Sequence, residues 1–432
     1  MRINLFAVGS RGDVQPAVAL GIGLQKAGFD VQLSAFEEFR SLIEEHGLGF
    51  VPLGANVQEL LNQYSGKKAF TGTALFGLLK LFQKMCSMMF TTLWQASRGC
   101  DLLISNTATS MFVEAVAEKL QVPDIETSVF PGWPTRAFPS FFGPWSPSLG
   151  ARRIGLAGQM TGAINRFSYK PVNWIVSLLL RPNIERCRRD ILGLPKKKPK
   201  RSDIKPAPIL AGFSKHVLPR PSDWEENIHV TGYWYLDHPG YEPPPALQAF
   251  LDQGEPPVYI GFGSMPSEDP GQVTDLVIQA LSMTKQRGIL FTGRGILGRG
   301  MNQRSSANPV HFVESIPHDW LLPRVAAAIH HGGAGTTAAG IRAGVPSILV
   351  PVGADQRLWA YRVETLGVGP RPIPRAGLTA ERLAKAITHA VTDHEICQRA
   401  VDLGGKIRAE DGVGAAVKLI REYLNDWPGG GM

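Results

Sequence analysis

The chain has 432 residues, too many for one ordinary hydrophobic core, so we expect two domains. Apolar residues make up 44% and charged residues 19% of the sequence, which excludes an intrinsically disordered chain. The formal net charge is +8, and the four cysteines are scattered without a CxxC pair, which excludes a disulfide framework and a cysteine-based zinc site.

The sequence pattern predicts a cytoplasmic protein. If it contacts a membrane, we expect it to do so only peripherally, at the membrane surface. The chain opens directly on the strand-like RINLFAVG, without a signal-peptide pattern. Of the two longest apolar stretches, 73–94 is interrupted by lysines and 172–180 is too short to span a bilayer. The basic run at 195–201 is interpreted first as a solvated linker. A membrane- or polyanion-facing patch and a nuclear-localisation string are its alternatives.

In the first half, short β-rich runs alternate with helical patterns. From Phe130 to Pro182 the chain is irregular and rich in Pro, Gly, Trp and Phe, and it then becomes helical. Strands that alternate with helices of this length predict a parallel sheet with crossover helices. The predicted strands are 3–9, 30–36, 49–54, 100–106 and 122–131, and the predicted helices are 14–28, 37–47 and 110–120.

The alternation restarts after the basic run, so we predict two doubly wound halves hinged near 200–225. Ligands of such sheets bind at the carboxyl ends of the strands, and two facing halves enclose a cleft. The second set of predicted strands is 207–213, 227–234, 256–264, 289–293, 310–315, 326–333 and 346–351. The predicted helices are 241–254, 273–288, 335–344, 379–393 and 414–426.

The strongest local signal is the stretch AAAIHHGGAGTTAAGIRAGVPSILVPVGADQ at 326–356. A strand ends at His331, small residues follow from Gly332 to Gly335, and a helix starts at Thr336. Small residues let the backbone approach an anion, and the helix start offers free N–H groups and a positive dipole end. The spacing fits neither a P-loop nor GxGxxG. The alternative interpretation is an ordinary tight turn.

Two further strand ends carry suitable polar groups. Ser264 follows the buried strand VYIGFG and either binds an anion or caps a helix. Asp355 and Gln356 follow the strand at 346–351 and offer acceptors and donors at short range, as vicinal sugar hydroxyls require. Read alone, an Asp-Gln pair in a loop is more often a solvated turn.

The block at 326–356 resembles the nucleotide-sugar signature of the GT-B glycosyltransferases. With GSRGDVQP near the start and PRPSDWEENIHVTGYWYLD and VYIGFGSM in the middle, the chain is similar to sterol 3-β-glucosyltransferases and bacterial antibiotic glycosyltransferases from Ile3 to about Leu424. The resemblance implies an α/β fold of two Rossmann-like domains that face each other across a cleft. It assigns acceptor binding to 1–205, UDP-sugar binding to 206–412, and a returning C-terminal helix and tail to 413–432.

The family implies inverting, metal-independent transfer of a hexose, with glucose favoured, from a UDP-sugar that acts as co-substrate, and no cofactor. No Asp-x-Asp pair occurs in the chain to hold a diphosphate-bound cation. A departure from the family pattern at 291–300 places Arg294 and Arg299 where related sequences carry Trp-Gly-Gly. By resemblance, the diphosphate is bound by Ser264, His331, Gly333, Ala334, Gly335 and Thr336, and the sugar by Asp355 and Gln356. The segment 313–320 is expected to border the uracil, which pairs with the backbone of Ile316 and stacks on Trp320, with a core role as the alternative for Trp320.

Asp13 occupies the position that the resemblance assigns to the general base, beside the acceptor hydroxyl and the leaving diphosphate. The alternative is that it caps the helix starting at Val14, and the two roles are compatible. Ser10, Arg11 and Gly12 are expected to touch the diphosphate from the acceptor side. Three backup candidates for the base are His318, Asp319 and Asp355.

The irregular, aromatic part of the first half is expected to bind a lipophilic acceptor such as a sterol, triterpenoid, polyketide aglycone or phenolic, although core packing is the alternative. A non-catalytic module that binds a lipid or nucleotide is the competing function. We expect no nucleic-acid partner and a monomer or weak oligomer. The predicted acceptor residues are Met85, Met89, Phe130, Trp133, Phe138, Phe141 and Trp145.

Overall fold

The structure is a computed structural model that describes residues 1–54, 86–141, 156–196, 206–262, 270–292, 310–353 and 355–427. A strand occurs at each of the twelve predicted places. The strands are β1 (Arg2–Phe6), β2 (Asp30–Ala35), β3 (Gly49–Pro52), β4 (Leu102–Asn106), β5 (Asp124–Ser128), β6 (Ile209–Ala211), β7 (Ile228–Val230), β8 (Val258–Gly261), β9 (Gly288–Phe291), β10 (Val310–Val313), β11 (Ala327–His330) and β12 (Ser347–Leu349).

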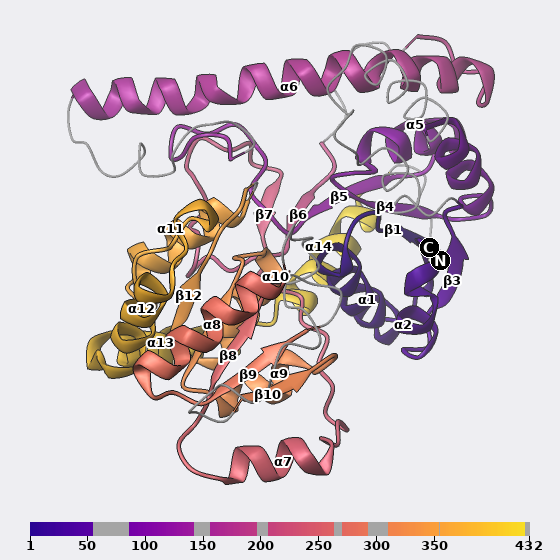
Figure 1. The fold of residues 1–432 in the computed structure, drawn as a ribbon. Helices are drawn as coiled ribbons and strands as arrows, with labels where there is room; N and C mark the ends of the chain where they lie inside the picture. The colour runs from indigo at the N-terminus through magenta and orange to yellow at the C-terminus, as the bar shows by residue number, and fades with distance from the viewer. Residues whose placement is uncertain are drawn as a thin grey trace.

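These strands form two parallel sheets (Figure 1), as the sequence predicts. The first has the order β3-β2-β1-β4-β5-β6-β7 and the second the order β10-β9-β8-β11-β12. The central strands are short runs of Val, Ile, Leu and Ala that are buried on both faces, which is typical of parallel sheets covered by helices.

The helices lie in the crossover connections and cover both sheets. They are α1 (Arg11–Lys26), α2 (Arg40–Glu44), a helix over 86–96, α5 (Ser110–Leu120), α6 (Leu156–Asp190), α7 (Pro245–Asp252), α8 (Pro270–Thr284), α9 (His318–Leu321), α10 (Ala334–Ala343), α11 (Gln356–Leu366), α12 (Ala380–Thr392), α13 (His394–Arg408) and α14 (Gly412–Asn425).

The helix over 86–96 and helices α9, α11 and α13 are absent from the sequence prediction, and α6 begins at Leu156, inside the region that the sequence predicts to be irregular up to Pro182. α13 contains the pair Gly404-Gly405, and glycine disfavours a helix interior. The structure explains Gly404 by close packing, because a Cβ there would lie 2.8 Å from the Cα of Gly344 at the end of α10. Tertiary contact therefore overrides the weak local preference.

The first sheet extends beyond the predicted domain boundary at 205/206. β6 pairs with β5 and β7 pairs with β6, both in parallel, so residues up to Val230 belong to the first sheet. The predicted boundary differs from the observed one because the basic run at 195–201 resembles an interdomain linker. In the chain it lies between β5 and β6, which belong to the same sheet. The second sheet begins only at Val258.

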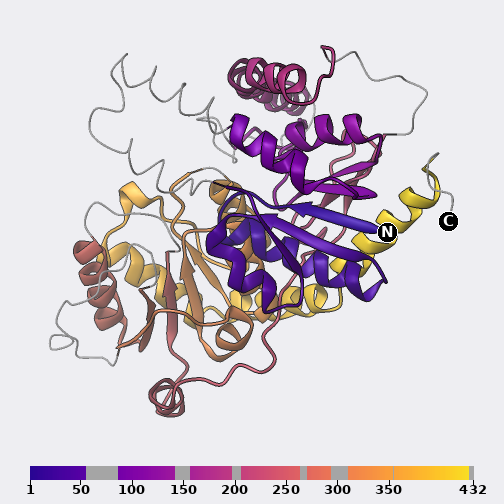
Figure 2. The same ribbon diagram turned by 90° about the vertical axis from the view of Figure 1, so that its right-hand side faces the viewer.

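The C-terminal helix α14 packs against α1 of the first half (Figure 2). A Cβ on Gly23 of α1 would lie 2.3 Å from Cγ1 of Val413, so the glycine permits close approach of the two helices. Arg421 donates a hydrogen bond to the backbone oxygen of Ala27, and Ile420 lies in the core of the first sheet.

A hydrophobic cluster joins the two halves. It combines aromatic residues from the first half with α10 and α11 of the second, and the rings of Phe213 and Trp359 lie 5.9 Å apart. The chain passes between the halves twice, and the two passages meet where Trp234 donates a hydrogen bond from Nε1 to the backbone oxygen of Gly412 (3.1 Å). None of the described helices is both long enough and apolar enough to cross a membrane.

Candidate active site

The loop between β1 and α1 is shaped by a capping box. Ser10 is the N-cap residue, and its Oγ accepts a hydrogen bond from the N–H of Gly12 (3.2 Å). Asp13 Oδ2 accepts in return from the N–H of Ser10 (2.8 Å) and from its hydroxyl (3.1 Å). The helix thus starts at Arg11 and not at Val14. The predicted capping role of Asp13 is corrected to the third position of a capping box.

Gly9 makes room for this arrangement. Its φ is 143°, a conformation that favours glycine, and a Cβ at this position would lie 2.2 Å from Asp13 Oδ2. The glycine therefore lets the Asp13 carboxylate fold back over the start of α1.

Asp13 borders a small cavity of about 60 Å³ at the carboxyl ends of β4 and β5. Burial raises the pKa of its carboxyl, and the two hydrogen bonds from Ser10 oppose that rise. The carboxylate is thus a stronger base than an exposed aspartate. The other lining residues are Pro16, Ala17, Asn106, Thr107, Ala108, Thr127, Ser128, Val129, Phe130 and Trp234.

Across from α1, the glycine-rich turn after β11 leaves a helix start without a side-chain cap. Gly332 has a φ of 89°, and Gly333 is the N-cap residue of α10 but offers no side-chain acceptor. The N–H groups of Ala334, Gly335 and Thr336 therefore remain available to an anion, and the α10 dipole favours negative charge there.

Two histidines flank this helix start. Burial lowers the pKa of His331 to about 4, and burial together with the nearby Arg11 charge lowers the pKa of His318 to about 4. Both rings are therefore neutral near pH 7. His331 Nδ1 is buried and has no hydrogen-bond partner among the described residues, whereas His318 Nε2 lies 3.1 Å from the hydroxyl of Tyr259.

Asp355 and Gln356 lie at the start of α11, after β12. Asp355 Oδ2 accepts a hydrogen bond from Nε1 of Trp359 (3.0 Å), and Gln356 Oε1 accepts from the N–H of Val352 (2.9 Å). Burial, with a smaller contribution from the Asp13 charge, raises the pKa of Asp355 to about 6. A Cβ on Gly332 would lie 3.2 Å from the backbone oxygen of Gln356, so the two turns of the 326–356 block touch.

The electrostatic couplings connect the two halves. Asp13 acts on Asp355, and Arg11 acts on His318, so the start of α1 faces the starts of α9 and α11. The carboxyl ends of both sheets therefore meet, as the sequence predicts for a cleft. Within the described ranges, no group of three His, Cys, Asp or Glu residues is arranged to hold a metal ion.

The Asp355 carboxylate should destabilise the unliganded fold near neutral pH. Its folded pKa is raised, so the folded state binds more protons than the unfolded state between about pH 4 and 6, and stability falls as the pH rises through that window. We expect Asp355→Asn to increase the free energy of unfolding by roughly 1 to 3 kcal/mol near neutral pH and by little below about pH 4. Denaturant unfolding at both pH values measures this, and an equal gain at both would contradict it.

The residues predicted for the uracil are engaged in packing. Ile316 is buried, and the ring of Trp320 lies 5.4 Å from that of Tyr241, with the guanidinium of Arg324 4.4 Å above it. Asp319, a backup candidate for the base, accepts a hydrogen bond from the N–H of His238 (2.7 Å). These contacts favour the core interpretation of Trp320 that the sequence leaves open.

Of the four described aromatic residues predicted for the acceptor, two are buried in the core and two are partly buried against it. Phe130 lines the Asp13 cavity, but Phe138 is buried and Trp133 packs edge-on against Trp224 at 5.3 Å. Phe141 is also buried, with its ring 5.5 Å from Phe130, and Met89 packs against the core of the first sheet. The predicted residues Met85, Trp145, Ser264, Arg294 and Arg299 lie outside the described residues.

Sequence reasoning missed several polar residues of the cavity. Asn106 ends β4 and donates from Nδ2 to the backbone oxygen of Val8 (2.7 Å), and Thr107 Oγ1 donates to the backbone oxygen of Thr127 (3.4 Å). The sequence carried a usable signal, because the polar run SNTATS follows a buried strand that neighbours β1.

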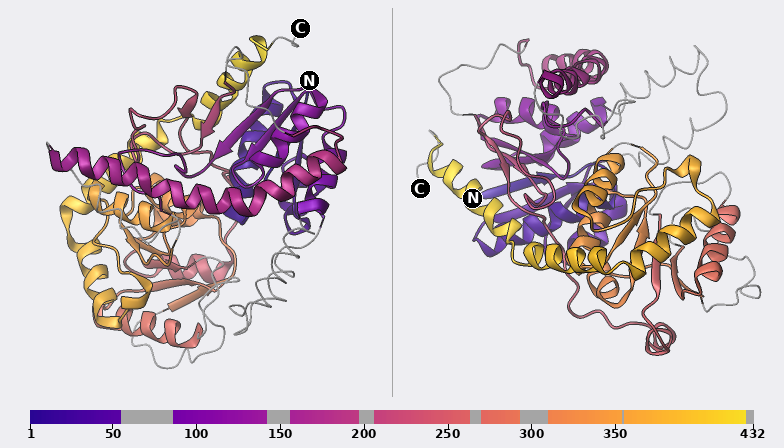
Figure 3. Two further views of the ribbon diagram at one scale, coloured as in Figure 1. Left: turned by 90° about the horizontal axis from the view of Figure 1, so that it is seen from above. Right: turned by 90° about the vertical axis from the view of Figure 1, so that its left-hand side faces the viewer.

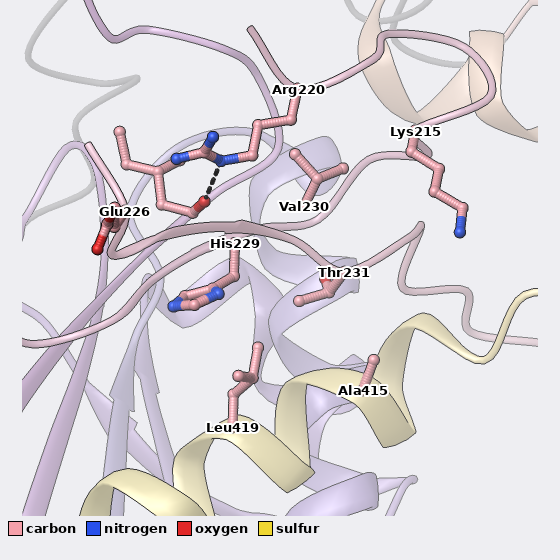
Figure 4. A pocket seen from close by; sticks show the side chains of 9 residues that line it. Lys215, Arg220, Glu226, His229, Val230, Thr231, Ala415 and Leu419 are labelled. Carbon is pink, nitrogen blue, oxygen red and sulfur yellow. Dashed lines mark hydrogen bonds between the residues drawn. The ribbon is translucent and has the colours of Figure 1, made fainter. Parts of the chain in front are cut away.

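A larger cavity of about 330 Å³ lies away from these strand ends, between the β7 segment and α14 (Figure 4). Arg220 lines it, but its guanidinium donates to the backbone oxygens of Ile228 (3.0 Å) and Trp224 (3.0 Å). This arginine fastens the loop before β7, and none of the predicted site residues reaches this cavity.

Comparison with known proteins identifies the family of this chain. A family model described as the glycosyltransferase family 28 N-terminal domain matches residues 3–139, and one described as the erythromycin biosynthesis protein CIII-like C-terminal domain matches residues 299–412. The chain is 35% identical to the sterol 3-beta-glucosyltransferase UGT80B1 of Arabidopsis thaliana over 429 residues, which cover 98% of this chain and 68% of that protein.

A sterol 3-beta-glucosyltransferase of Cryptococcus neoformans is also 35% identical, over 98% of this chain, but the chain spans only 27% of its length. Solved structures share the fold. They include the calicheamicin glycosyltransferase CalG4 (TM-score 0.67, 18% identity, 99% of each chain) and the spinosyn forosaminyltransferase SpnP (TM-score 0.68, 15% identity, 99% of this chain and all of that one). The chain therefore belongs to the GT-B glycosyltransferase family that includes the sterol 3-beta-glucosyltransferases.

Proposed function

We propose that this chain is an inverting, metal-independent glycosyltransferase that moves a hexose, most simply glucose, from a UDP-sugar to a hydroxyl of a lipophilic, sterol-like acceptor. The observation that carries the proposal is that the Asp13 charge acts on Asp355 across the two halves, while Gly332, just before the start of α10, lies against Gln356. We infer that one base, one set of anion donors and one sugar-binding carboxylate serve a single site.

The second half would bind the donor. The uncapped N–H groups at the start of α10 would bind the diphosphate, together with the ring of His331, whose Nε2 lies beside Gly333. They would stabilise the negative charge that develops on the diphosphate as the sugar leaves. Asp355 would accept hydrogen bonds from sugar hydroxyls, because a carboxylate offers about four lone pairs and can accept from them besides the bond from Trp359.

Asp13 would act as the general base. It removes the proton of the acceptor hydroxyl, the hydroxyl oxygen forms a bond to C1 of the sugar, and the C1–oxygen bond to the diphosphate breaks on the opposite face. The products are an inverted glycoside and UDP. The raised pKa of Asp13 supports this role, because a base works best when its pKa approaches the working pH.

The cavity beside Asp13, at about 60 Å³, would hold the hydroxyl end of an apolar alcohol and not the whole molecule. Pro16, Ala17, Phe130 and Trp234 supply apolar surface, while Asn106 and Thr107 lie near the carboxylate. The matched relatives named for sterols favour a sterol-like acceptor, and a phenolic or polyketide aglycone is the second candidate. A non-catalytic module would not need a partly buried carboxylate beside the acceptor cavity.

An acceptor screen tests the proposal. We expect UDP-glucose to yield UDP and a glycoside of the expected mass with at least one sterol-like alcohol, and no UDP release above background without an acceptor. Parallel trials with phenolic and polyketide aglycones distinguish the second candidate. If the protein binds UDP but turns over no hydroxylated acceptor, the proposed enzymatic activity is wrong and the non-catalytic binding module is favoured.

A further inference from the structure

Helix α6 carries a continuous apolar stripe on its outer side. Met160, Ile164, Phe167, Trp174 and Leu178 are each between 51% and 66% exposed. Their spacings of three, four and seven residues place them on one face of a helix, and Pro171 falls on the same face. In Figure 1 and in the left view of Figure 3, α6 runs along the outside of the molecule, across both halves.

The opposite side of α6 is fastened to the molecule. Asn165 Nδ2 donates to the backbone oxygen of Arg136 (2.9 Å), and the hydroxyl of Tyr169 donates to the backbone oxygen of Phe138 (3.3 Å). Asn165 and Tyr169 are buried. The exposed stripe therefore cannot turn inward without breaking these contacts, and about 27 Å of helix presents large apolar side chains to solvent.

The charges of α6 are all positive over 156–184, the part that carries the stripe, and the acidic residues Glu185 and Asp190 lie in its last turns. The helix contains Arg166, Lys170 and Arg181 but no aspartate or glutamate from 156 to 184. Lys170 and Arg181 are exposed beside the stripe, and the Lys170 ammonium lies 5.5 Å from the ring of Phe167. Arg166 is instead paired with Asp223 at 3.4 Å.

We propose that this face of α6 docks on an anionic phospholipid surface. A helix that lies in a membrane interface buries an apolar face to the depth of the headgroups and places lysine and arginine beside it, where anionic lipids attract them. The absence of acidic residues over 156–184 matches a negatively charged partner. Trp and Phe on the stripe are suited to the boundary between headgroups and acyl chains.

Docking would bring the acceptor cavity to the membrane. The inner side of α6 holds the segment at 136–140, which follows Phe130 on the rim of the Asp13 cavity. A lipophilic alcohol dissolved in the bilayer would then enter the cavity without crossing water. This consequence rests on the proposed function, whereas the docking itself does not.

Vesicle co-sedimentation of the full chain tests the docking. We expect the protein to bind vesicles of phosphatidylcholine and phosphatidylserine, and to bind phosphatidylcholine alone more weakly. The double variant Phe167→Ser/Trp174→Ser should bind the mixed vesicles roughly 10- to 100-fold more weakly, because two large side chains lose interfacial burial. Lys170→Gln/Arg181→Gln should reduce binding roughly 10-fold or more on the anionic vesicles and little on the neutral ones.

Val176→Ser provides the matched control. Val176 is 43% exposed, but it lies on the other side of the same helix, so this variant should bind vesicles as strongly as the parent protein does. Thermal unfolding checks that the variants fold. A parent protein that stays in the supernatant, or a Phe167→Ser/Trp174→Ser variant that binds unchanged, would overturn the proposal. If the parent protein forms a dimer that this variant disrupts, and does not bind vesicles, the face binds a second copy of the chain and the membrane proposal is wrong. Turnover of a water-soluble acceptor is measured separately. Vesicle binding without any turnover would contradict the proposed glycosyltransferase activity but not the proposed membrane docking.

Discussion

Asp13→Asn is expected to lower kcat by roughly 10²- to 10⁴-fold, the contribution typical of a general base, while the affinity for UDP stays near that of the parent protein. The asparagine side chain keeps an oxygen that can accept the hydrogen bond from the Ser10 N–H, so the start of α1 should persist. Single-turnover assays with UDP-glucose and calorimetry with UDP measure the two quantities independently.

A Ser10→Ala variant is the matched control that distinguishes the role of Asp13 as a general base from its role in the helix capping box. Ser10→Ala removes the N-cap acceptor for the Gly12 N–H and should cost about 1 kcal/mol of stability, but it leaves the carboxylate in place. It should also raise the pKa of Asp13, because both hydrogen bonds that lower it involve Ser10 and the one from the hydroxyl is lost. Near-parent turnover of Asp13→Asn would show that its carboxylate serves the helix alone.

His331→Ala is expected to weaken UDP binding roughly 10- to 100-fold, the range for a lost hydrogen bond to a charged group. The ring lies at the start of α10, and its buried Nδ1 has no partner in the described part of the chain. The diphosphate charge should also raise the low pKa of His331 in the complex. UDP should then bind more tightly as the pH falls, and this trend should vanish in the variant.

His389→Ala is the control for this experiment. His389 is an exposed histidine at the end of α12, where it pairs with Asp393, so its removal should leave UDP affinity and its pH dependence unchanged. If His331→Ala binds UDP as tightly as the parent protein, the diphosphate lies elsewhere, and the assignment of the 331–336 turn is wrong.

Local patterns were sufficient for the architecture. The twelve strands are short apolar runs bounded by turn residues, and the sequence predicts each of them because period and composition are local properties. The same logic identified the glycine-rich turn after β11 as an open helix start. It failed at α13, where Gly404 is tolerated only because α10 packs against it, and at β6 and β7, whose sheet membership depends on pairing with distant β5.

The sequence by itself determined the fold class and the polar groups at strand ends, because residue type and spacing decide which segments form strands and helices and where the turns between them lie. Only the tertiary structure decided what those groups face. The pKa of Asp355 rises because folding buries it near Asp13, more than three hundred residues away, and Asp13 can fold back onto Ser10 because Gly9 has no side chain. Burial decided equally that Phe138 belongs to the core and that Phe167 faces solvent, since two similar aromatic residues differ only in what the folded chain places around them.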